Sequence, residues 1–297
     1  MKNFYEIIKK LSSEIGPREV NSTANKRAED FIYNYLSELK YDVSLQEIII
    51  DNKSYGNNIL ACLPESQELQ RIVLVGAHYD TVKLSHGACD NASGVAAMLE
   101  MAKRFVGVDT QSTRLIFAAF NAEELGSFGS QAYVNSLDDR ERQLHYAAFT
   151  MDVFASESTE SETRHDREHR ETAIVCQTCG GRGEEAYVSG SETEAVENSV
   201  SRAFGSALRD RGLVDDLSPD SRIWALRSYA HSDHASFHNS QIDSANITIR
   251  GTRANKGRLS STYHRPEDTY DSLDFELCPL ALDLLYDSIS KAVFLHE

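Results

Sequence analysis

The chain has 297 residues, of which 41% are hydrophobic, so it can bury a large core as one sizeable α/β domain or two small ones. Its formal net charge of −16 argues against nucleic acid or an anionic membrane as a partner, because both need clustered Lys and Arg to meet phosphate groups. The chain contains no apolar run of about 18 residues and no basic head followed by an apolar segment at its start. Its five cysteines, an odd number, suit reduced thiols. We therefore expect a cytoplasmic protein, or a secreted one if a leader was trimmed.

The predicted elements alternate between helices and short strands. Apolar residues at helical spacing predict helices over 2–14 and about 22–39. The segments DVSLQEIII and NILACLP flank the polar turn DNKSYGN, which predicts a β-hairpin with a glycine-containing loop. Four nearly continuous apolar runs follow, as is typical of strands buried on both faces: IVLVGA (72–77), LIFAAF (115–120), YAAFTMDV (146–153) and TAIVCQT (172–178).

Further helices are expected at about 93–106, 129–137, 194–209 and 279–295. The alternation predicts a single α/β domain over 1–297, with a largely parallel central sheet between helices and antiparallel strands added by the hairpin. Two segments break the pattern. Residues 155–171 form a polar loop, and 180–225 are an irregular excursion rich in Gly, Ser and charge.

Potential metal ligands follow the ends of successive predicted strands. Because ligands of open α/β sheets bind beyond the carboxyl ends of the strands, we expect these side chains to converge at one sheet edge. Two more candidates join them, one just before the helix that begins near Ser93 and one in the loop STYHRPEDT. In chain order the candidates are His78, Asp80, Asp90, Glu123, Glu124, Asp152 and His264.

Each of these residues alone has an ordinary explanation. An Asp before a helix is usually an N-cap, a single His a hydrogen-bonded structural residue, and adjacent glutamates a solvated turn. Several carboxylates and imidazoles at one edge, however, would repel or stay unpaired unless a cation neutralised them. Imidazole and carboxylate ligands without a thiolate favour zinc, with cobalt or manganese possible, over magnesium and calcium.

Two metal ions fit the number of ligands better than one. If Asp90 bridges, one ion takes His78 and Asp152 while the other takes Glu124 and His264, and each keeps an open position for water. Three carboxylates against two divalent ions leave a residual positive charge. That charge would lower the pKa of a bridging water toward neutrality and polarise a substrate carbonyl.

Glu123 is the one carboxylate not assigned to a metal ion, and it would act as general base and then pass the proton to a leaving amine.

Four segments resemble, in order, the metal-binding motifs of the dizinc exopeptidase family of leucyl-type aminopeptidases and aminopeptidase Y: HYDTVKLSHGACDNASG, NAEELGSFGS, FTMDV and YHRPEDT. LSSEIGPREVNSTANKRAEDFI and SDHASF are also similar, so the resemblance covers most of the chain. It implies a mixed sheet of about eight strands sandwiched by helices, two zinc ions, and removal of N-terminal residues from peptides.

Carried over by position, the resemblance makes five residues the metal ligands: His78, Asp90, Glu124, Asp152 and His264. It makes Glu123 the general base that takes a proton from water to give the attacking hydroxide bridging the ions, and Asp80 the carboxylate that orients His78. Asp80 also has a physical reason for this role, because a metal-bound imidazole needs its other N–H fixed. Tyr263 is a candidate for holding the substrate oxyanion. Asp233, in SDHASF, is a candidate supporting residue, with a purely structural role equally open.

Two further patterns resemble metal or redox sites. HDREH (165–169) has the H-x-x-E-H spacing of another class of zinc protease, and Cys176 and Cys179 of CQTC follow it. The surroundings of HDREH contain almost no apolar residues, so nothing would bury such a helix. CQTC lies in a predicted strand rather than at a helix start, which argues against a redox pair. We interpret these segments as a solvated loop and a core strand, with a structural zinc site as the minor alternative.

Three functions remain open. The favoured one is a zinc-dependent aminopeptidase acting on peptides, with carboxypeptidase or dipeptidase specificity as a variant. The second is a glutaminyl cyclase-like aminoacyltransferase with one zinc on the same fold, which the presence of both His78 and a bridging-type Asp90 argues against. The third is a non-catalytic binding relative, which the complete ligand set with Glu123 argues against. The oligomeric state is left open.

Overall fold

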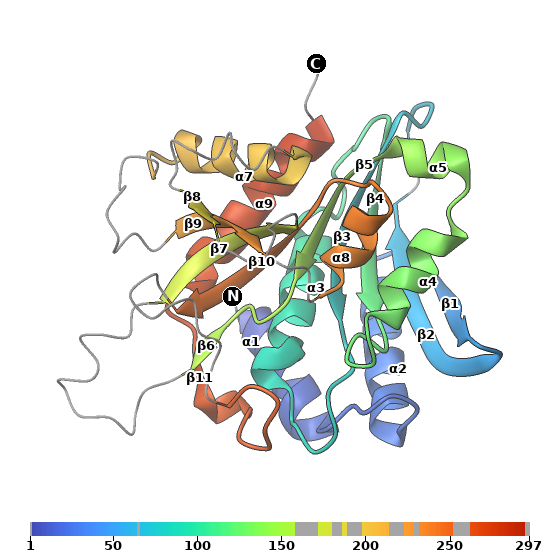
Figure 1. Cartoon of the computed structure of the whole chain (residues 1–297), viewed down its shortest axis with the longest axis vertical. Coiled ribbons are helices and arrows are strands. Elements are labelled where there is room, and N and C mark those ends of the chain that lie inside the picture. The colour runs from blue at the N-terminus through green and yellow to red at the C-terminus, as the bar shows by residue number, and fades with distance from the viewer. Residues whose placement is uncertain are drawn as a thin grey trace.

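A computed structural model describes residues 2–63, 66–157, 172–179, 186–188, 198–213, 223–228, 232–251 and 262–294. The HDREH segment and much of 155–171 and 180–225 lie outside these ranges. The described residues form one α/β domain, in which helices cover both faces of a mixed central sheet (Figure 1). The predicted fold class is therefore confirmed.

The central sheet has nine strands within the described ranges, one more than the approximate eight implied by the resemblance. In chain order they are β1 (Asp42–Ile50), β2 (Lys53–Cys62), β3 (Arg71–His78), β4 (Thr113–Phe120), β5 (His145–Met151), β7 (Thr172–Cys179), β8 (Ala186–Val188), β9 (Ile223–Ser228) and β10 (Ser244–Gly251). Their spatial order is β1-β2-β4-β3-β5-β10-β7-β9-β8. The central strands β4, β3, β5 and β10 run parallel, whereas the predicted hairpin β1–β2 joins β4 antiparallel.

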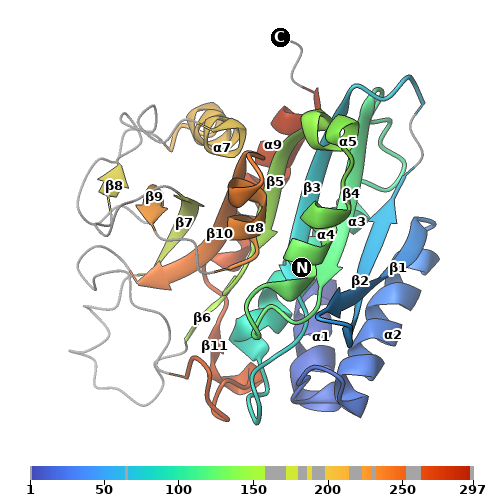
Figure 2. The ribbon, with the colours of Figure 1, turned by 45° about the vertical axis from the view of Figure 1, so that its right-hand side comes forward.

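The helices lie in two layers, as Figure 2 shows from a second side. Their bounds are α1 (Lys2–Lys9), α2 (Thr23–Glu38), α3 (Gly94–Arg104), α4 (Phe128–Ser136), α5 (Asp139–Leu144), α7 (Ser199–Asp210), α8 (His234–Asn239) and α9 (Cys278–Phe294), with short turns η1 (Lys10–Ile15), η2 (Ala88–Ser93) and η5 (Tyr270–Ser272). Two very short strands, β6 (Ser156–Glu157) and β11 (Leu273–Asp274), pair separately. Among the described helices, none is long and apolar enough to cross a lipid bilayer.

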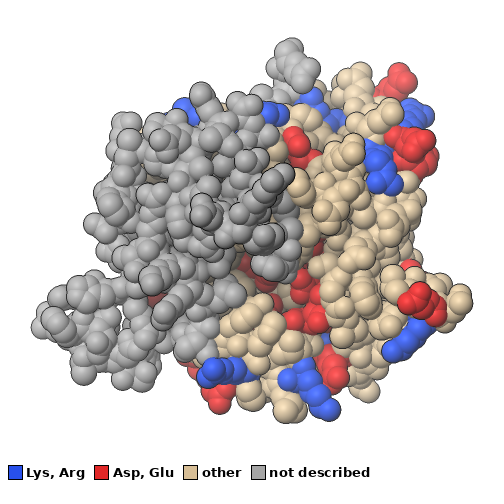
Figure 3. All heavy atoms as spheres, in the orientation of Figure 1, with Lys and Arg blue, Asp and Glu red and all other residues tan. Residues whose placement is uncertain are grey.

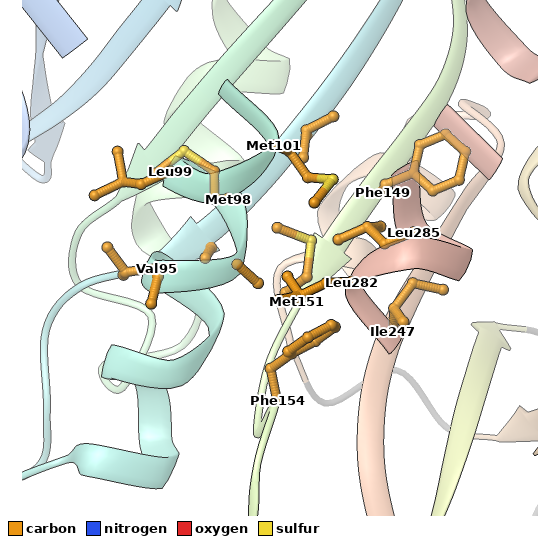
Figure 4. Packing of buried hydrophobic residues seen from close by; sticks show 14 of the residues in the cluster. Val95, Met98, Leu99, Met101, Phe149, Met151, Phe154, Ile247, Leu282 and Leu285 are labelled. Atoms are coloured by element: carbon orange, nitrogen blue, oxygen red, sulfur yellow. The ribbon is translucent and has the colours of Figure 1, made fainter. Parts of the chain in front are cut away.

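Neighbouring positions of the central strands pack on opposite faces of the sheet. On β3, Val73 belongs to the core formed with α3 and α9, whereas Leu74 belongs to the core formed with α4 and α8. Figure 4 shows part of the first core, to which α3 contributes Met98, β5 contributes Phe149 and α9 contributes Leu282. Because both faces are covered, these strands need apolar side chains at every position, which explains their continuous apolar runs.

Strand β10 was not predicted, although it lies between β5 and β7 in the middle of the sheet. Its sequence SANITIRG alternates polar and apolar residues, and Ser244, Asn246 and Thr248 are buried. Their hydrogen bonds make this burial tolerable. Ser244 Oγ donates to the carbonyl of His234 at 2.8 Å, and Thr248 Oγ1 to that of Val153 at 3.1 Å.

Candidate metal centre

The carboxyl ends of β4, β3 and β5 lie side by side. His78, the last residue of β3, pairs in register with Phe120, the last of β4, and Gly76 pairs with Thr150 near the end of β5. Side chains that follow these strands therefore meet at one edge of the sheet, as expected from the sequence. Figure 3 shows acidic side chains gathered near the centre of this face of the molecule.

Two groups of three potential ligands lie at this edge. One contains His78, Asp90 and Asp152, and the other contains Asp90, Glu124 and His264. Within each group the ligand atoms are all within 4.8 Å of one another. Asp90 belongs to both groups, so the structure brings all five sequence-predicted ligands together around one shared carboxylate.

The two oxygens of Asp90 face different imidazoles. Its Oδ1 lies 3.2 Å from Nε2 of His78, and its Oδ2 lies 3.2 Å from Nε2 of His264. Asp152 Oδ1 is 3.5 Å from the same His78 nitrogen, and Glu124 Oε2 is 3.2 Å from the same His264 nitrogen. In each group, an imidazole Nε2 and two carboxylate oxygens therefore converge on one point, as ligands do around a cation.

The donor atoms fit a metal ion because several of them have no other partner. His78 is 1% exposed and Asp90 is 3% exposed. Within the described residues, Nε2 of His78 makes no hydrogen bond, and Glu124 Oε1 and Asp152 Oδ1 make none either. Unpaired buried polar atoms cost free energy, so these imidazole and carboxylate groups suit a divalent ion such as zinc.

The charges at the site also favour a cation. Burial lowers the pKa of His78, but Glu123 and the other surrounding carboxylates outweigh burial and raise the pKa well above its usual value. Hydrogen bonds to Asp90 and Glu124 raise the pKa of His264 to about 10. Without metal, the nearby carboxylates thus favour the protonated form of both imidazoles, and a divalent ion that binds the imidazoles would displace those protons.

Glu123 lies beside the two ligand groups and belongs to neither. Its Oε2 is 4.0 Å from Nε2 of His78, and its Oε1 accepts a hydrogen bond from Ser127 Oγ at 3.4 Å. The chain turns sharply here, since Ala122 has a φ of 60° and the main-chain N–H groups of Gly126 and Ser127 both donate to the carbonyl of Glu123. This turn lets two successive glutamates take different positions at one strand end.

Asp80 has more contacts than the sequence predicted. Its Oδ1 lies 3.5 Å from Nδ1 of His78, which is the expected orienting contact. The same carboxylate accepts the main-chain N–H of Glu123 at 3.1 Å and that of Glu124 at 3.2 Å. Asp80, which is fully buried, therefore connects the imidazole at the end of β3 to both glutamates after β4.

Tyr263 and Asp233 both lie near the ligand groups. The Tyr263 ring stacks on His264 with centroids 3.9 Å apart, and burial raises the pKa of its phenol, so the hydroxyl keeps its proton. Asp233 is 1% exposed, and burial raises its pKa to about 7. Its charge contributes to the raised pKa of Glu123, for which burial is the larger cause.

Sequence reasoning missed two buried charged residues behind Asp90, namely Arg18 and Asp268. Asp268 is in the motif YHRPEDT, so its nearness to His264 was the available signal. Arg18 is in the segment LSSEIGPREVNSTANKRAEDFI, whose resemblance to the family was the available signal, but nothing in the segment marks this arginine as buried. Cys176 of CQTC is buried in β7, and burial raises its pKa to about 12, as suits a core strand.

A cavity of about 760 Å³ opens beside the metal-ligand groups and is lined by residues of α4 and α8. Glu123, Glu124, Tyr263 and His264 are among the residues that line it. The other lining residues belong to the two helices and the residues next to them, and most have hydroxyl or amide side chains. They are Ser127, Gln131, Asn135, Ser236, Asn239 and Ser240, together with Gly126, Val134, Ser232 and Ala235. The lining thus offers neutral hydrogen-bond donors and acceptors next to the carboxylates.

Comparisons with known proteins identify relatives in sequence and proteins of similar fold. Aminopeptidase YwaD from Bacillus subtilis (strain 168) is 31% identical over 242 residues, which cover 82% of this chain and 46% of YwaD, so the chain spans about half the length of that relative. The structure of BSAP, a zinc aminopeptidase from Bacillus subtilis, superposes with a TM-score of 0.80 at 21% identity, covering 98% of this chain and 94% of that one.

Porphyromonas gingivalis glutaminyl cyclase has the same fold, with a TM-score of 0.71 at 16% identity over 98% of this chain and 96% of that one. The two solved structures thus share the α/β architecture with this protein and are too distant in sequence to show more. Residues 58–285, well over half of the chain, match Peptidase family M28. The protein belongs to Peptidase family M28.

Proposed function

We propose that the protein is a zinc-dependent aminopeptidase that removes N-terminal residues from peptides. The observation that carries the proposal is the position of Asp90, whose two oxygens face His78 and His264 at 3.2 Å each, with the buried carboxylate of Glu123 beside them. Membership of a peptidase family supports peptide hydrolysis. The aminopeptidase activity printed in the names of YwaD and BSAP supports an N-terminal cleavage site.

Two zinc ions would occupy the site. His78, Asp90 and Asp152 would hold one ion, and Asp90, Glu124 and His264 would hold the other, while cobalt or manganese would suit the same donors. When bound, the ions supply positive charge that acidifies a water molecule and polarises the peptide carbonyl. Two complete ligand groups distinguish this assignment from the single-zinc, glutaminyl cyclase-like alternative.

Glu123 would transfer the proton during hydrolysis. It would accept a proton from the attacking water and return it to the nitrogen of the leaving peptide. Burial raises the pKa of Glu123, which favours a carboxylate able to take up a proton and give it back at neutral pH. Tyr263, whose phenol stays protonated, would donate a hydrogen bond to the oxygen that becomes negative.

The cavity between α4 and α8 would hold the part of the peptide that leaves. Glu123, which protonates the leaving nitrogen in this mechanism, lines the cavity. Apart from Glu123, Glu124 and His264, the described lining residues carry no charge, so their amides and hydroxyls match a peptide main chain better than a charged side chain. We therefore expect little selection for the side chains of the leaving residues.

The test is a screen of aminoacyl p-nitroanilides and tripeptides with free or acetylated N-termini, run after chelation and again with zinc restored. The proposal predicts cleavage of free N-termini alone, restored by zinc, with about two zinc ions per chain by elemental analysis. Equal cleavage of acetylated peptides would refute N-terminal specificity. A single bound zinc with cyclisation of N-terminal glutamine and no hydrolysis would move the assignment to the glutaminyl cyclase-like alternative.

A further inference from the structure

Arg18 is a fully buried cation whose guanidinium contacts main-chain carbonyls. Its Nε donates to the carbonyl of Tyr79 at 2.8 Å, Nη1 to that of His86 at 2.9 Å, and Nη2 to that of Gly87 at 2.8 Å. Nη1 also donates to the carbonyls of Leu11 and Gly16. Burial lowers the pKa of Arg18 to about 10, so it stays charged at neutral pH.

Asp268 contacts the same stretch of chain from the other side. One carboxylate oxygen accepts the main-chain N–H of Cys89 at 2.7 Å, and the other accepts that of Asp90 at 3.1 Å. The main-chain carbonyl of Asp268 accepts the N–H of Ala88 at 3.2 Å. Asp268 is fully buried and belongs to the loop that carries His264.

Residues 86–90 are therefore held from two sides. The carbonyls of His86 and Gly87 face a buried cation, and the next three N–H groups face residue 268. Gly87 has a φ of 59°, and a Cβ there would lie 2.3 Å from Thr81 Cγ2, 2.5 Å from the main-chain oxygen of Asp90 and 2.7 Å from Arg18 Nη2, so this tightly packed turn has no room for a side chain. This stretch ends at Asp90, the residue shared by both ligand groups.

We propose that Arg18 and Asp268 are positioning residues that set the main chain of residues 86–90 so that the two oxygens of Asp90 face the two ligand groups that would hold metal. The inference rests on the proposed metal site. Arg18 lies before residue 58, where the family match begins, so the match does not include it. Asp268 also ties the His264 loop to the Asp90 loop, and it thereby sets the spacing of two ligands that are far apart in sequence.

The geometry requires both residue types. A guanidinium presents five N–H donors in one plane, whereas a lysine ammonium presents three from a single atom and cannot reach carbonyls on three segments. An ionised carboxylate only accepts, so it can receive two N–H groups, whereas an amide would turn a donor toward one of them. Arg18→Lys and Asp268→Asn therefore remove the positioning contacts with little change in side-chain size.

The experiment compares these two variants and the double variant with matched controls. Arg104→Lys is the control for arginine, because Arg104 bonds Glu100 and Asp283 at the far end of α3. Asp243→Asn is the control for aspartate, because Asp243 accepts the main-chain N–H of Ser199 at 2.7 Å before the start of β10, at the opposite sheet edge. Zinc affinity is measured by competition with a chromophoric chelator, and unfolding temperature on the metal-free protein.

Each positioning variant is expected to bind zinc about 10–100-fold more weakly, the usual effect of losing a contact that orients a ligand, and the controls to change it less than about threefold. The double variant should lose less than the product of the two single losses, since both residues hold one segment. Lower unfolding temperatures with unchanged zinc affinity would overturn the inference. If Arg18→Lys fails to fold, the zinc affinity of Asp268→Asn, compared with that of its control Asp243→Asn, tests the inference. Because zinc affinity is measured without substrate, a failed search for peptidase activity leaves this result intact.

Discussion

Glu123→Gln exchanges one carboxylate oxygen for an amide in a side chain that lies outside both ligand groups. The change keeps the size of the side chain and the contact distance to Ser127, but the amide can no longer accept and return a proton. We expect zinc binding to persist while kcat falls. General base catalysis contributes about 10²–10⁴-fold, which corresponds to about 3–5 kcal/mol of transition-state stabilisation.

Glu124→Gln is the matched control, because it makes the same chemical change one residue further along. Glu124 Oε2 lies 3.2 Å from Nε2 of His264, and its Oε1 has no hydrogen-bond partner in the described part of the chain. Losing this carboxylate weakens the group formed by Asp90, Glu124 and His264. We therefore expect loss of about one zinc equivalent after dialysis, which Glu123→Gln should retain.

The assay pairs elemental analysis of dialysed protein with steady-state kinetics on one peptide. The two variants should differ in metal content and in kcat. Glu123→Gln should retain its metal and lose kcat, whereas Glu124→Gln should lose metal. Turnover near that of the wild type in Glu123→Gln would refute the role of Glu123 as base. Equal metal loss in both variants would show that Glu123 is a ligand.

Three further changes test other parts of the site. Asp80→Asn turns a donor toward the main-chain N–H groups of Glu123 and Glu124, so zinc titration should show about 10–100-fold weaker binding, and wild-type affinity would contradict this. Asn239→Trp fills the cavity and should lower kcat/KM for tripeptides about tenfold, or 1.4 kcal/mol, while sparing anilides. His238→Trp, on the same helix outside the described lining, should change neither substrate. Chelation should lower the unfolding temperature, since free zinc at 100 times its Kd stabilises by about 2.7 kcal/mol, and an unchanged temperature would count against a native metal site.

The fold was predictable where burial leaves a simple pattern. The apolar runs of β3, β4 and β5 are continuous because helices cover both sides of the sheet, and such runs indicate buried strands directly. Strand β10 is equally central, but the buried side chains of Ser244, Asn246 and Thr248 interrupt its apolar pattern. Their partners lie outside the strand, since the carbonyl of His234 is in the preceding helix α8 and that of Val153 is 95 residues from Thr248, so the strand's own sequence does not reveal that these polar residues are buried.

The site was predictable at the level of residue types at strand ends. His78, Glu123, Glu124 and Asp152 follow strands that are neighbours in a parallel sheet, so the topology alone brings them together. His264 was a candidate from its residue type and motif, but its loop follows no predicted strand, so the topology of the sheet does not place it beside the other ligands. Arg18 and the contacts of Asp80 to two main-chain N–H groups depend on how loops cross, and periodicity carries no information about loop crossings.

We expect the acidic residues of the site to have three different roles, and the neighbours of each carboxylate decide which role it has. Asp90 faces imidazole nitrogens, which leaves its oxygens free to bind cations. Asp80 and Asp268 face main-chain N–H groups, which use up their oxygens and make them anchors for the loops that carry the ligands. Glu123 has one hydroxyl donor and is in neither ligand group, so it alone among these four is free to carry a proton. Replacing Asp80 or Asp268 should therefore weaken zinc binding, because the loops that carry the ligands lose their positions. Replacing Glu123 should lower kcat and leave zinc affinity unchanged, so the two measurements distinguish the roles.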